Sequence, residues 1–316
     1  MSAVIYRLIG AVVAAAVLLL PTPSGVHAQD EQRGPATVYV KFLFGFDAKL
    51  SGTPLTWVSC IFIDPASEEV YLLDSGNSRV VVTDREGIFL YQFRYSEAGL
   101  SNPRYLSVDP RNGDIYMAEN NRIAVLNYRG DYKRDVDLTK VPDYERLQIQ
   151  SFYIVYDDDG GGRIYMGDNT LGRVVTVTLD GEFVGQFVRD DVVFGNVKGL
   201  YVDEENEELV FLDPGMFSVF IFGLDGEFIH RFGRVSSLMG GFSMATGMAV
   251  DKANGRIIVV DTNRMMIIGF DWDGKALFEF GGPTVFKWPR AVGVDFEGRI
   301  YVADNTGVIK VFEVVE

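Results

Sequence analysis

The stretch PRAVGVDFEGRIYVADNTGVIKVF, residues 289–312, decides the fold of this chain. It contains three short runs rich in β-branched and aromatic residues, at 291–294, 299–303 and 308–312. Glycine, asparagine and aspartate separate the runs, which is typical of strands joined by tight turns. The sequence ends before a fourth run can follow, so the stretch predicts three strands of a sheet that needs another partner.

The same pattern recurs along the whole chain, which indicates a repeat protein. An apolar run ends in an acidic residue at six places, spaced by 44 to 48 residues: Asp64, Asp109, Asp157, Asp203, Asp251 and Asp295. A second acidic residue ends the next run of each unit, at Asp74, Glu119, Asp168, Asp213, Asp261 and Asp304. Four short strands in each period of roughly 40–50 residues are typical of a propeller blade. The sequence therefore predicts an all-β fold, a six-bladed β-propeller with four-stranded blades.

The sixth unit lacks its outer strand at the C-terminal end, and residues 37–45, TVYVKFLFG, supply a candidate for it. An open ring would leave strand edges and apolar surface exposed. We therefore expect this N-terminal strand to join the last blade and to close the ring.

The units resemble NHL repeats of the secreted bacterial type. The resemblance rests on WPRAVGVDFEGRIYVADNTG in the sixth unit, NPRYLSVDPRNGDIYMAENNRIAVL in the second, and LDGEF at two places in the third and fourth. It implies the six-bladed fold and leaves the activity open, because one fold can carry many functions.

The N-terminus has the order of a secretory signal. Arg7 precedes an apolar run at 8–20, and Val26, His27 and Ala28 form a cleavage site with small residues. We expect a signal peptide at 1–28 and a single propeller domain at 29–316, exported to the periplasm or the cell exterior, without a membrane span after cleavage. An uncleaved N-terminal anchor is the alternative.

Composition narrows the classes of partner. The formal net charge of −15 disfavours nucleic acid, which needs a basic surface. Cys60, the one cysteine, excludes an internal disulfide and fits a buried small hydrophobe within an apolar strand.

Residue counts also limit the chemistry. His230 would be the one histidine of the mature chain, on an outer strand, so a histidine-rich zinc site and a serine–histidine–aspartate triad are not expected. We predict no catalytic residue, no resident metal and no cofactor. A calcium site built from carboxylates is left open, because hard cations take six to eight oxygen ligands. Asp157, Asp158 and Asp159 are the most acidic cluster, with a solvated turn as the simpler interpretation.

A basic funnel is the candidate binding site. Arg104, Lys198 and Arg290 share one repeat position, five residues before the acidic end of the first strand, and Trp57 and Trp288 share the position seven before it. We expect them to converge at a channel mouth that binds an anionic or planar group; surface charges that balance nearby acids are the alternative. Arg122 joins the candidates, although its repeat position, shared with Arg79 and Arg173, also fits a structural ion pair. The long insertion at 133–150 lies on the same predicted face.

We therefore favour a non-catalytic binding or scaffolding module for a protein, peptide or small anionic ligand. The alternative is a hydrolase or lyase that depends on a divalent cation, because gluconolactonase-type propellers resemble this architecture and bind a cation at the channel mouth.

Overall fold

The computed structural model describes residues 38–47, 52–157, 159–188 and 194–315. The segment Thr37–Glu316 is one compact unit. The described residues form six four-stranded antiparallel sheets and no α-helix, which confirms the predicted fold class. The predicted signal peptide lies outside the described residues. None of the described helices is long and apolar enough to cross a membrane.

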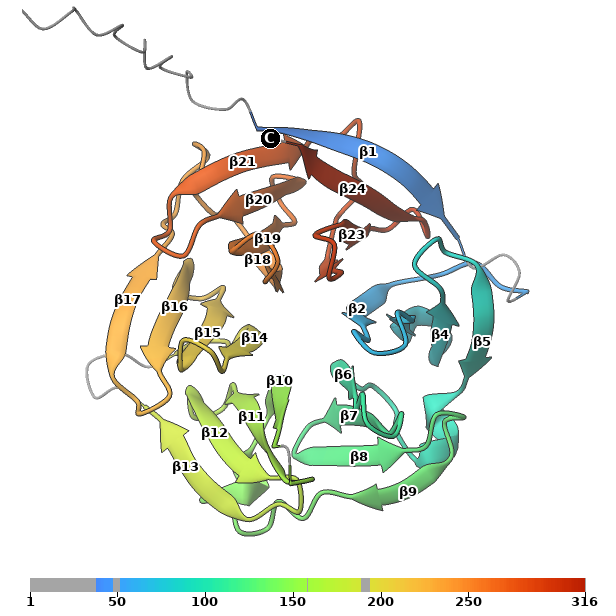
Figure 1. Cartoon of the computed structure of the whole chain (residues 1–316), viewed down its shortest axis with the longest axis vertical. Helices are drawn as coiled ribbons and strands as arrows, with labels where there is room; N and C mark the ends of the chain where they lie inside the picture. The colour runs from blue at the N-terminus through green and yellow to red at the C-terminus, as the bar shows by residue number, and fades with distance from the viewer. Residues whose placement is uncertain (1–37, 48–51, 158, 189–193, 316) are drawn as a thin grey trace, which may run out of the picture. The chain divides into compact units, whose positions relative to one another are not determined.

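The sheets are arranged as blades around a central channel, with one inner strand of each blade at the channel (Figure 1). From the channel outward, the first three blades are β2 Val58–Ile63, β3 Val70–Asp74, β4 Arg79–Thr83 and β5 Phe89–Phe93; β6 Tyr105–Val108, β7 Ile115–Glu119, β8 Arg122–Leu126 and β9 Tyr132–Asp135; β10 Ile149–Tyr156, β11 Gly162–Asp168, β12 Arg173–Thr178 and β13 Phe183–Phe187.

Blades 4 to 6 follow the same order. They are β14 Lys198–Asp203, β15 Glu208–Asp213, β16 Ser218–Gly223 and β17 Phe228–Phe232; β18 Ala245–Asp251, β19 Arg256–Asp261, β20 Met266–Phe270 and β21 Ala276–Gly281; β22 Ala291–Val294, β23 Ile300–Ala303, β24 Ile309–Val315 and β1 Tyr39–Phe46. Three short 3-10 helices lie in loops: η2 Ser75–Asn77, η3 Tyr95–Ala98 and η4 Tyr144–Arg146.

The N-terminal strand closes the ring as predicted. β1 pairs antiparallel with β24, from Tyr39 opposite Val315 to Phe46 opposite Ile309. Figure 1 shows β1 at the outer edge of the blade that ends the chain. Phe42 packs edge-on against Phe312 at 5.6 Å, so the closure has an apolar contact as well as backbone hydrogen bonds.

The core lies between adjacent blades, because each sheet buries both faces against its neighbours. The second and third strands have the most deeply buried side chains; Leu72 on β3 and Val81 on β4 are fully buried. Such strands consist of near-continuous apolar residues, which agrees with the sequence of β4, RVVVT.

Outer strands are linked to the next blade by an aromatic ring on a glycine turn. Phe46, Phe93 and Phe232 each lie against the glycine of the following blade's outer turn: Gly87, Gly130 and Gly274. Each of these glycines has a positive φ, and a Cβ added at Gly130 would lie 2.4 Å from the ring of Phe93. The glycine therefore serves two purposes, a left-handed turn and room for the ring.

This contact generates a prediction about stability. Gly130→Ala should cost about 1–3 kcal/mol more free energy of unfolding than Gly226→Ala, because overpacking against a ring adds to backbone strain. Gly226 is the matched control: its φ is +93° against +89° for Gly130, yet an added Cβ would meet nothing within 4 Å. Urea unfolding of the two variants measures the difference. Equal losses would contradict the role given to the phenylalanine.

Candidate functional site

A carboxylate at the end of each second strand fixes the start of the inner strand beside it. The carboxylate accepts a hydrogen bond from a backbone N–H in the loop that leads to the channel. The six donor–acceptor pairs are Thr56–Asp74 at 2.8 Å, Ser101–Glu119 at 3.1 Å, Gln148–Asp168 at 3.2 Å, Gly195–Asp213 at 2.7 Å, Ser243–Asp261 at 2.6 Å and Lys287–Asp304 at 2.9 Å.

The residue three positions after each donor lines one cavity at the channel mouth. These residues are Ser59, Arg104, Ser151, Lys198, Thr246 and Arg290. Hydroxyl and cationic side chains alternate around this ring, one from each blade, so blades 1, 3 and 5 contribute hydroxyls and blades 2, 4 and 6 contribute cations. We call these six residues the mouth ring. The cavity that they line has a volume of about 190 Å³.

The three cations have no carboxylate partner in the part of the chain that the structure describes. Among the described residues, the side chains of Arg104, Lys198 and Arg290 form no ion pair and no hydrogen bond. The Arg290 guanidinium stacks over the Trp57 ring at 3.4 Å, and its Nε is buried without a hydrogen-bond partner. Burial lowers the pKa of Arg290. Burial also lowers the pKa of Lys198, and the nearby positive charges of Arg104 and Arg290 lower it further. The mouth therefore concentrates positive charge that the protein leaves uncompensated.

The hydroxyls of the mouth ring are held by second-layer partners. Ser59 Oγ lies 2.7 Å from Ser75 Oγ, and Thr246 Oγ1 lies 2.6 Å from Thr262 Oγ1. Ser151 Oγ donates to the Val197 carbonyl at 3.2 Å. A hydroxyl has one donor proton and two acceptor lone pairs. Ser151 and Thr246 donate their protons within the protein, so Ser59 is the member whose hydroxyl can donate to a ligand, when Ser75 donates to it.

The structure brings together four of the six residues singled out from the sequence. Arg104, Lys198, Arg290 and Trp57 line the same cavity. Trp288 has the same positive φ of 58° as Trp57 and the same 48% exposed fraction, but it does not line that cavity.

Arg122 lies away from the mouth and holds the outer part of blade 2 together. Its Nε donates to Asp135 on β9 at 2.8 Å, and one terminal nitrogen donates to the Gly99 carbonyl at 3.2 Å. Arg173 has an equivalent position, with its Nε bound to Asp168 and a terminal nitrogen bound to the Pro142 carbonyl. The structural interpretation of this repeat position therefore fits Arg122, and the mouth does not include it.

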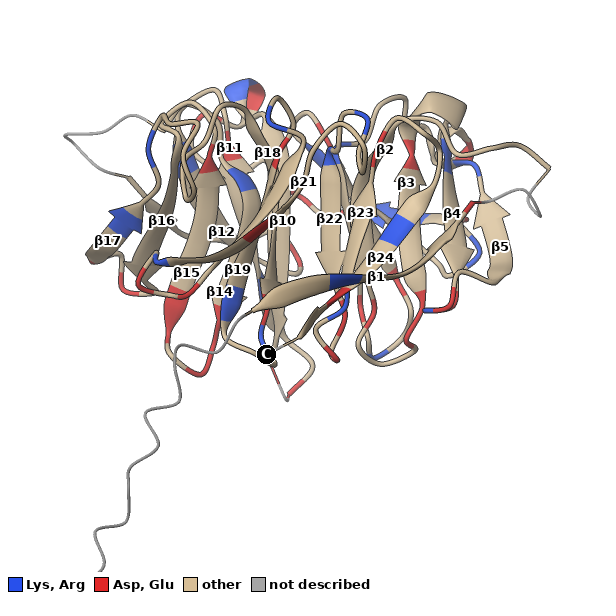
Figure 2. Ribbon diagram, turned by 90° about the horizontal axis from the view of Figure 1, so that it is seen from above, with Lys and Arg blue, Asp and Glu red and all other residues tan. Residues whose placement is uncertain are grey.

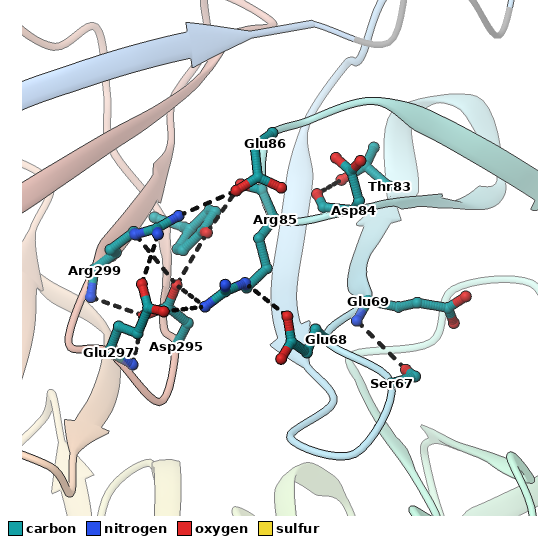
Figure 3. Close-up of polar contacts among 11 residues, drawn as sticks. Ser67, Glu68, Glu69, Thr83, Asp84, Arg85, Glu86, Asp295, Glu297 and Arg299 are labelled. Atoms are coloured by element: carbon teal, nitrogen blue, oxygen red, sulfur yellow. Dashed lines mark hydrogen bonds and ion pairs between the residues drawn. The ribbon is translucent and has the colours of Figure 1, made fainter.

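Several other cations on the same side of the propeller as the mouth are paired with carboxylates. Buried Arg79 and Arg173 bind Asp74 and Asp168, and Arg264 binds Glu279. Carboxylates gather in the turns that follow the inner strands, along the lower edge in Figure 2. Some of these carboxylates are paired: Arg85 binds Glu68 at 3.2 Å and Glu297 at 3.1 Å, a network that joins blade 1 to blade 6 (Figure 3). The three mouth cations differ from these arginines because they line one cavity together and have no carboxylate partner among the described residues.

The insertion at 133–150 is less exposed than its length suggested. Its first residues belong to β9, the outer strand of blade 2, and Val136, Leu138, Val141 and Leu147 are buried between blades 2 and 3. The insertion therefore contributes to the core, and its apolar residues are not available to a partner.

The other residues considered for catalysis or metal binding are Cys60, His230 and the acidic cluster at 157–159, and their contacts fit structural roles. Burial raises the pKa of Cys60 to about 12, so its thiolate is disfavoured. His230 Nε2 lies 2.8 Å from the Trp272 carbonyl, on outer strand β17. Asp159 accepts the Gly161 N–H, and Asp158 lies outside the described residues. Within the described residues, no three His, Cys, Asp or Glu side chains are placed to hold a metal ion.

The sequence analysis missed the interior of the channel. Phe62, Tyr105, Tyr153 and Tyr201 line a cavity of about 610 Å³ that adjoins the mouth cavity. Tyrosines on inner strands were the available signal, because a buried tyrosine needs a partner for its hydroxyl or contact with water.

Comparison with known proteins supports the fold and leaves the activity open. No family model and no curated protein matches the chain. Among solved structures, streptogramin B lyase matches with a TM-score of 0.58 at 14% identity, over 88% of this chain and 98% of that one. A catalytically inactive virginiamycin B lyase from Staphylococcus aureus with quinupristin matches at 0.55 and 17%, over 82% and 80%. A luciferin-regenerating enzyme matches at 0.60 and 12%, over 88% and 95%. At these identities the likeness shows the six-bladed propeller fold.

Removing one positive charge from the mouth should stabilise the protein. We expect Lys198→Met to raise the melting temperature by about 2 °C at pH 7, because the folded chain holds the lysine charge next to two arginines in a partly buried place. The folded protein binds this proton less tightly than the unfolded chain does. The loss of stability caused by the Lys198 charge is therefore complete below the pKa of Lys198 in the folded protein. It shrinks as the pH rises and vanishes above the ordinary lysine pKa of 10.5. Melting curves at pH 7 and in alkaline buffer test this; a lower melting temperature at pH 7 would contradict it.

Proposed function

We propose that this chain is a non-catalytic binding module, an exported propeller of the NHL-repeat type, and that it binds an oxyanion at the mouth ring. The observation that carries the proposal is a set of three cations that line one cavity and have no carboxylate partner among the described residues. Arginine and lysine donors, supplemented by hydroxyls, are the groups that bind phosphate, sulfate and carboxylate in proteins.

The energetics of the free site support this proposal. Three like charges that share a partly desolvated cavity cost stability, and no described carboxylate offsets the cost. An anion in the cavity would relieve the repulsion and provide an acceptor for Arg290 Nε, which is buried without a partner.

The chemistry of the mouth favours binding over catalysis. The Staphylococcus aureus lyase described above is a catalytically inactive variant in which alanine replaces a histidine. The described part of this chain has His230 as its histidine, and it lies on an outer strand away from the channel. A cation-dependent hydrolase or lyase would need ligands that the described carboxylates are not placed to provide. A protein or peptide partner would bind through carboxylate or phosphate groups at the same ring.

Substitution of the mouth cations tests the proposal. Inorganic phosphate and sulfate should bind to the wild-type protein in isothermal titration calorimetry at constant ionic strength. Arg104→Ala and Arg290→Ala should each weaken binding about 10- to 100-fold, the usual effect of losing a charge-assisted hydrogen bond.

Arg129→Ala is the matched control, because Arg129 is exposed in an outer turn and contacts Tyr128. Its affinity should equal that of the wild type. The proposal fails if neither anion binds to the wild type, or if Arg104→Ala binds as tightly as the control.

A further inference from the structure

The mouth cavity adjoins a larger cavity inside the channel, which we call the lumen. The lumen has a volume of about 610 Å³, within the range of small-molecule sites. The two cavities adjoin because they share five lining residues: Ile61, Tyr105, Gly199, Met248 and Val292. The two cavities therefore lie next to each other along the inner strands, with these five residues between them.

The lumen differs in character from the mouth, because its walls are aliphatic and aromatic. Tyr105 lies edge-on to Phe152 with ring centres 5.5 Å apart, and Tyr153 lies edge-on to Tyr201 at 5.1 Å. Isoleucine, leucine, valine and methionine side chains from all six inner strands fill the remaining wall: Ile61, Val108, Ile154, Leu200, Met248 and Val292 are among them. Such a wall favours an apolar body over an ion.

Polar groups are sparse along the lumen and cluster toward its far end. Tyr156 Oη is buried there without a hydrogen-bond partner. Glu204, Lys252 and Asp295 line that end as well, and Asp295 is already bound by the backbone N–H groups of Glu297 and Arg299. Lys252 also lines the far end, and Arg85 and Arg299 lie 3.8 and 3.9 Å from Asp295, so charges there are largely balanced. The three cations at the mouth therefore orient an anionic ligand with its head at the mouth.

We propose that the ligand is a small amphiphile, with an oxyanion head bound by the mouth ring and an apolar body that extends into the lumen. This inference rests on the proposed function and names the ligand class of the same site. Along β6, from Arg104 at the mouth to Val108 in the lumen, the chain covers about 13 Å at roughly 3.3 Å per residue. The channel therefore suits an elongated body of about that length.

A series of straight-chain monoalkyl phosphates tests the inference on the full wild-type chain. The series runs from ethyl to decyl, with inorganic phosphate as the reference and all concentrations kept below micelle formation. Isothermal titration calorimetry should show tighter binding with each added methylene, up to about fourfold per group where burial is complete. The matching alkyl carboxylates should show the same dependence on length if the head is recognised as an oxyanion in general.

A bulky side chain in the lumen distinguishes binding of the oxyanion head from binding of the apolar body. Ala249 lines the lumen and not the mouth cavity, so Ala249→Phe should abolish the dependence on chain length and leave the binding of inorganic phosphate unchanged. Val184→Phe adds the same ring on outer strand β13, where Val184 is 51% exposed, and should behave as the wild type. Val294→Phe replaces Ala249→Phe if the latter does not fold, since Val294 also lines the lumen alone.

The outcomes distinguish this inference from the proposed function. If decyl phosphate binds no more tightly than inorganic phosphate, and Arg104→Ala weakens the binding of both, the proposal of an amphiphilic ligand is wrong. The proposed oxyanion site is then supported. If no phosphate of any length binds, both proposals fail. If affinity grows with chain length equally in Ala249→Phe and the wild type, the apolar body binds elsewhere and the inference is overturned.

Discussion

The structure depends on one hydrogen bond that is repeated in every blade, from a loop N–H to a carboxylate at the end of the second strand. Asp74, Asp168, Asp213 and Asp261 are fully buried at this position. A buried carboxylate is costly unless it is fully hydrogen-bonded. Here the loop N–H, and in blades 1 and 3 an arginine Nε, provide the bonds. Each inner strand therefore begins at a defined distance from the channel axis.

This constraint produces the site without any special loop. Because every loop is held at the same residue, the side chain three positions later points to the same ring in every blade. The fold thus offers six equivalent positions, and the chemistry is set by which residues occupy them. Serine, arginine, serine, lysine, threonine and arginine stand there in chain order. The cations lie on alternate blades, which keeps them as far apart as six positions allow while they still share one cavity.

The repeat made most of the fold predictable. The spacing of the acidic residues indicated six blades, and the absence of a fourth strand in 289–312 indicated closure by the N-terminal strand; the pairing of β1 with β24 confirms both. The outer strand of blade 2 was missed, because Tyr132–Asp135 is mostly exposed and lacks apolar alternation. Outer strands have little to bury on one side, so their sequence has a weaker signal than that of inner strands.

The candidate site was predictable in part. Arg104, Lys198 and Arg290 stood out because their charge breaks an otherwise apolar pattern, whereas Ser59 and Thr246 at the same repeat position did not. Ser151 lies one residue earlier in its unit, where β10 has an irregular register. Alternation along a strand separates the two faces of a blade, but it does not tell which residues near the axis contact a neighbouring blade and which line the channel. Trp57 and Trp288 share one repeat position and one backbone conformation, but only Trp57 lines the mouth cavity. Trp57 contacts an arginine of the neighbouring blade, Arg290, so the environment of each tryptophan depends on the blade beside it. That information lies in the three-dimensional order of the blades.

The seam of the ring connects stability to the site. Arg290 belongs to blade 6 and Trp57 leads into blade 1, so their stacking spans the same boundary that β1 closes on the outside. On the opposite face, Arg85 of blade 1 binds Glu297 of blade 6 across this boundary (Figure 3). The boundary is therefore held at the mouth, at the far end of the channel and at the outer edge. Because Arg290 is a member of the mouth ring, the cavity keeps its shape as long as the first and last blades remain joined, and the contacts that close the propeller also position the cation.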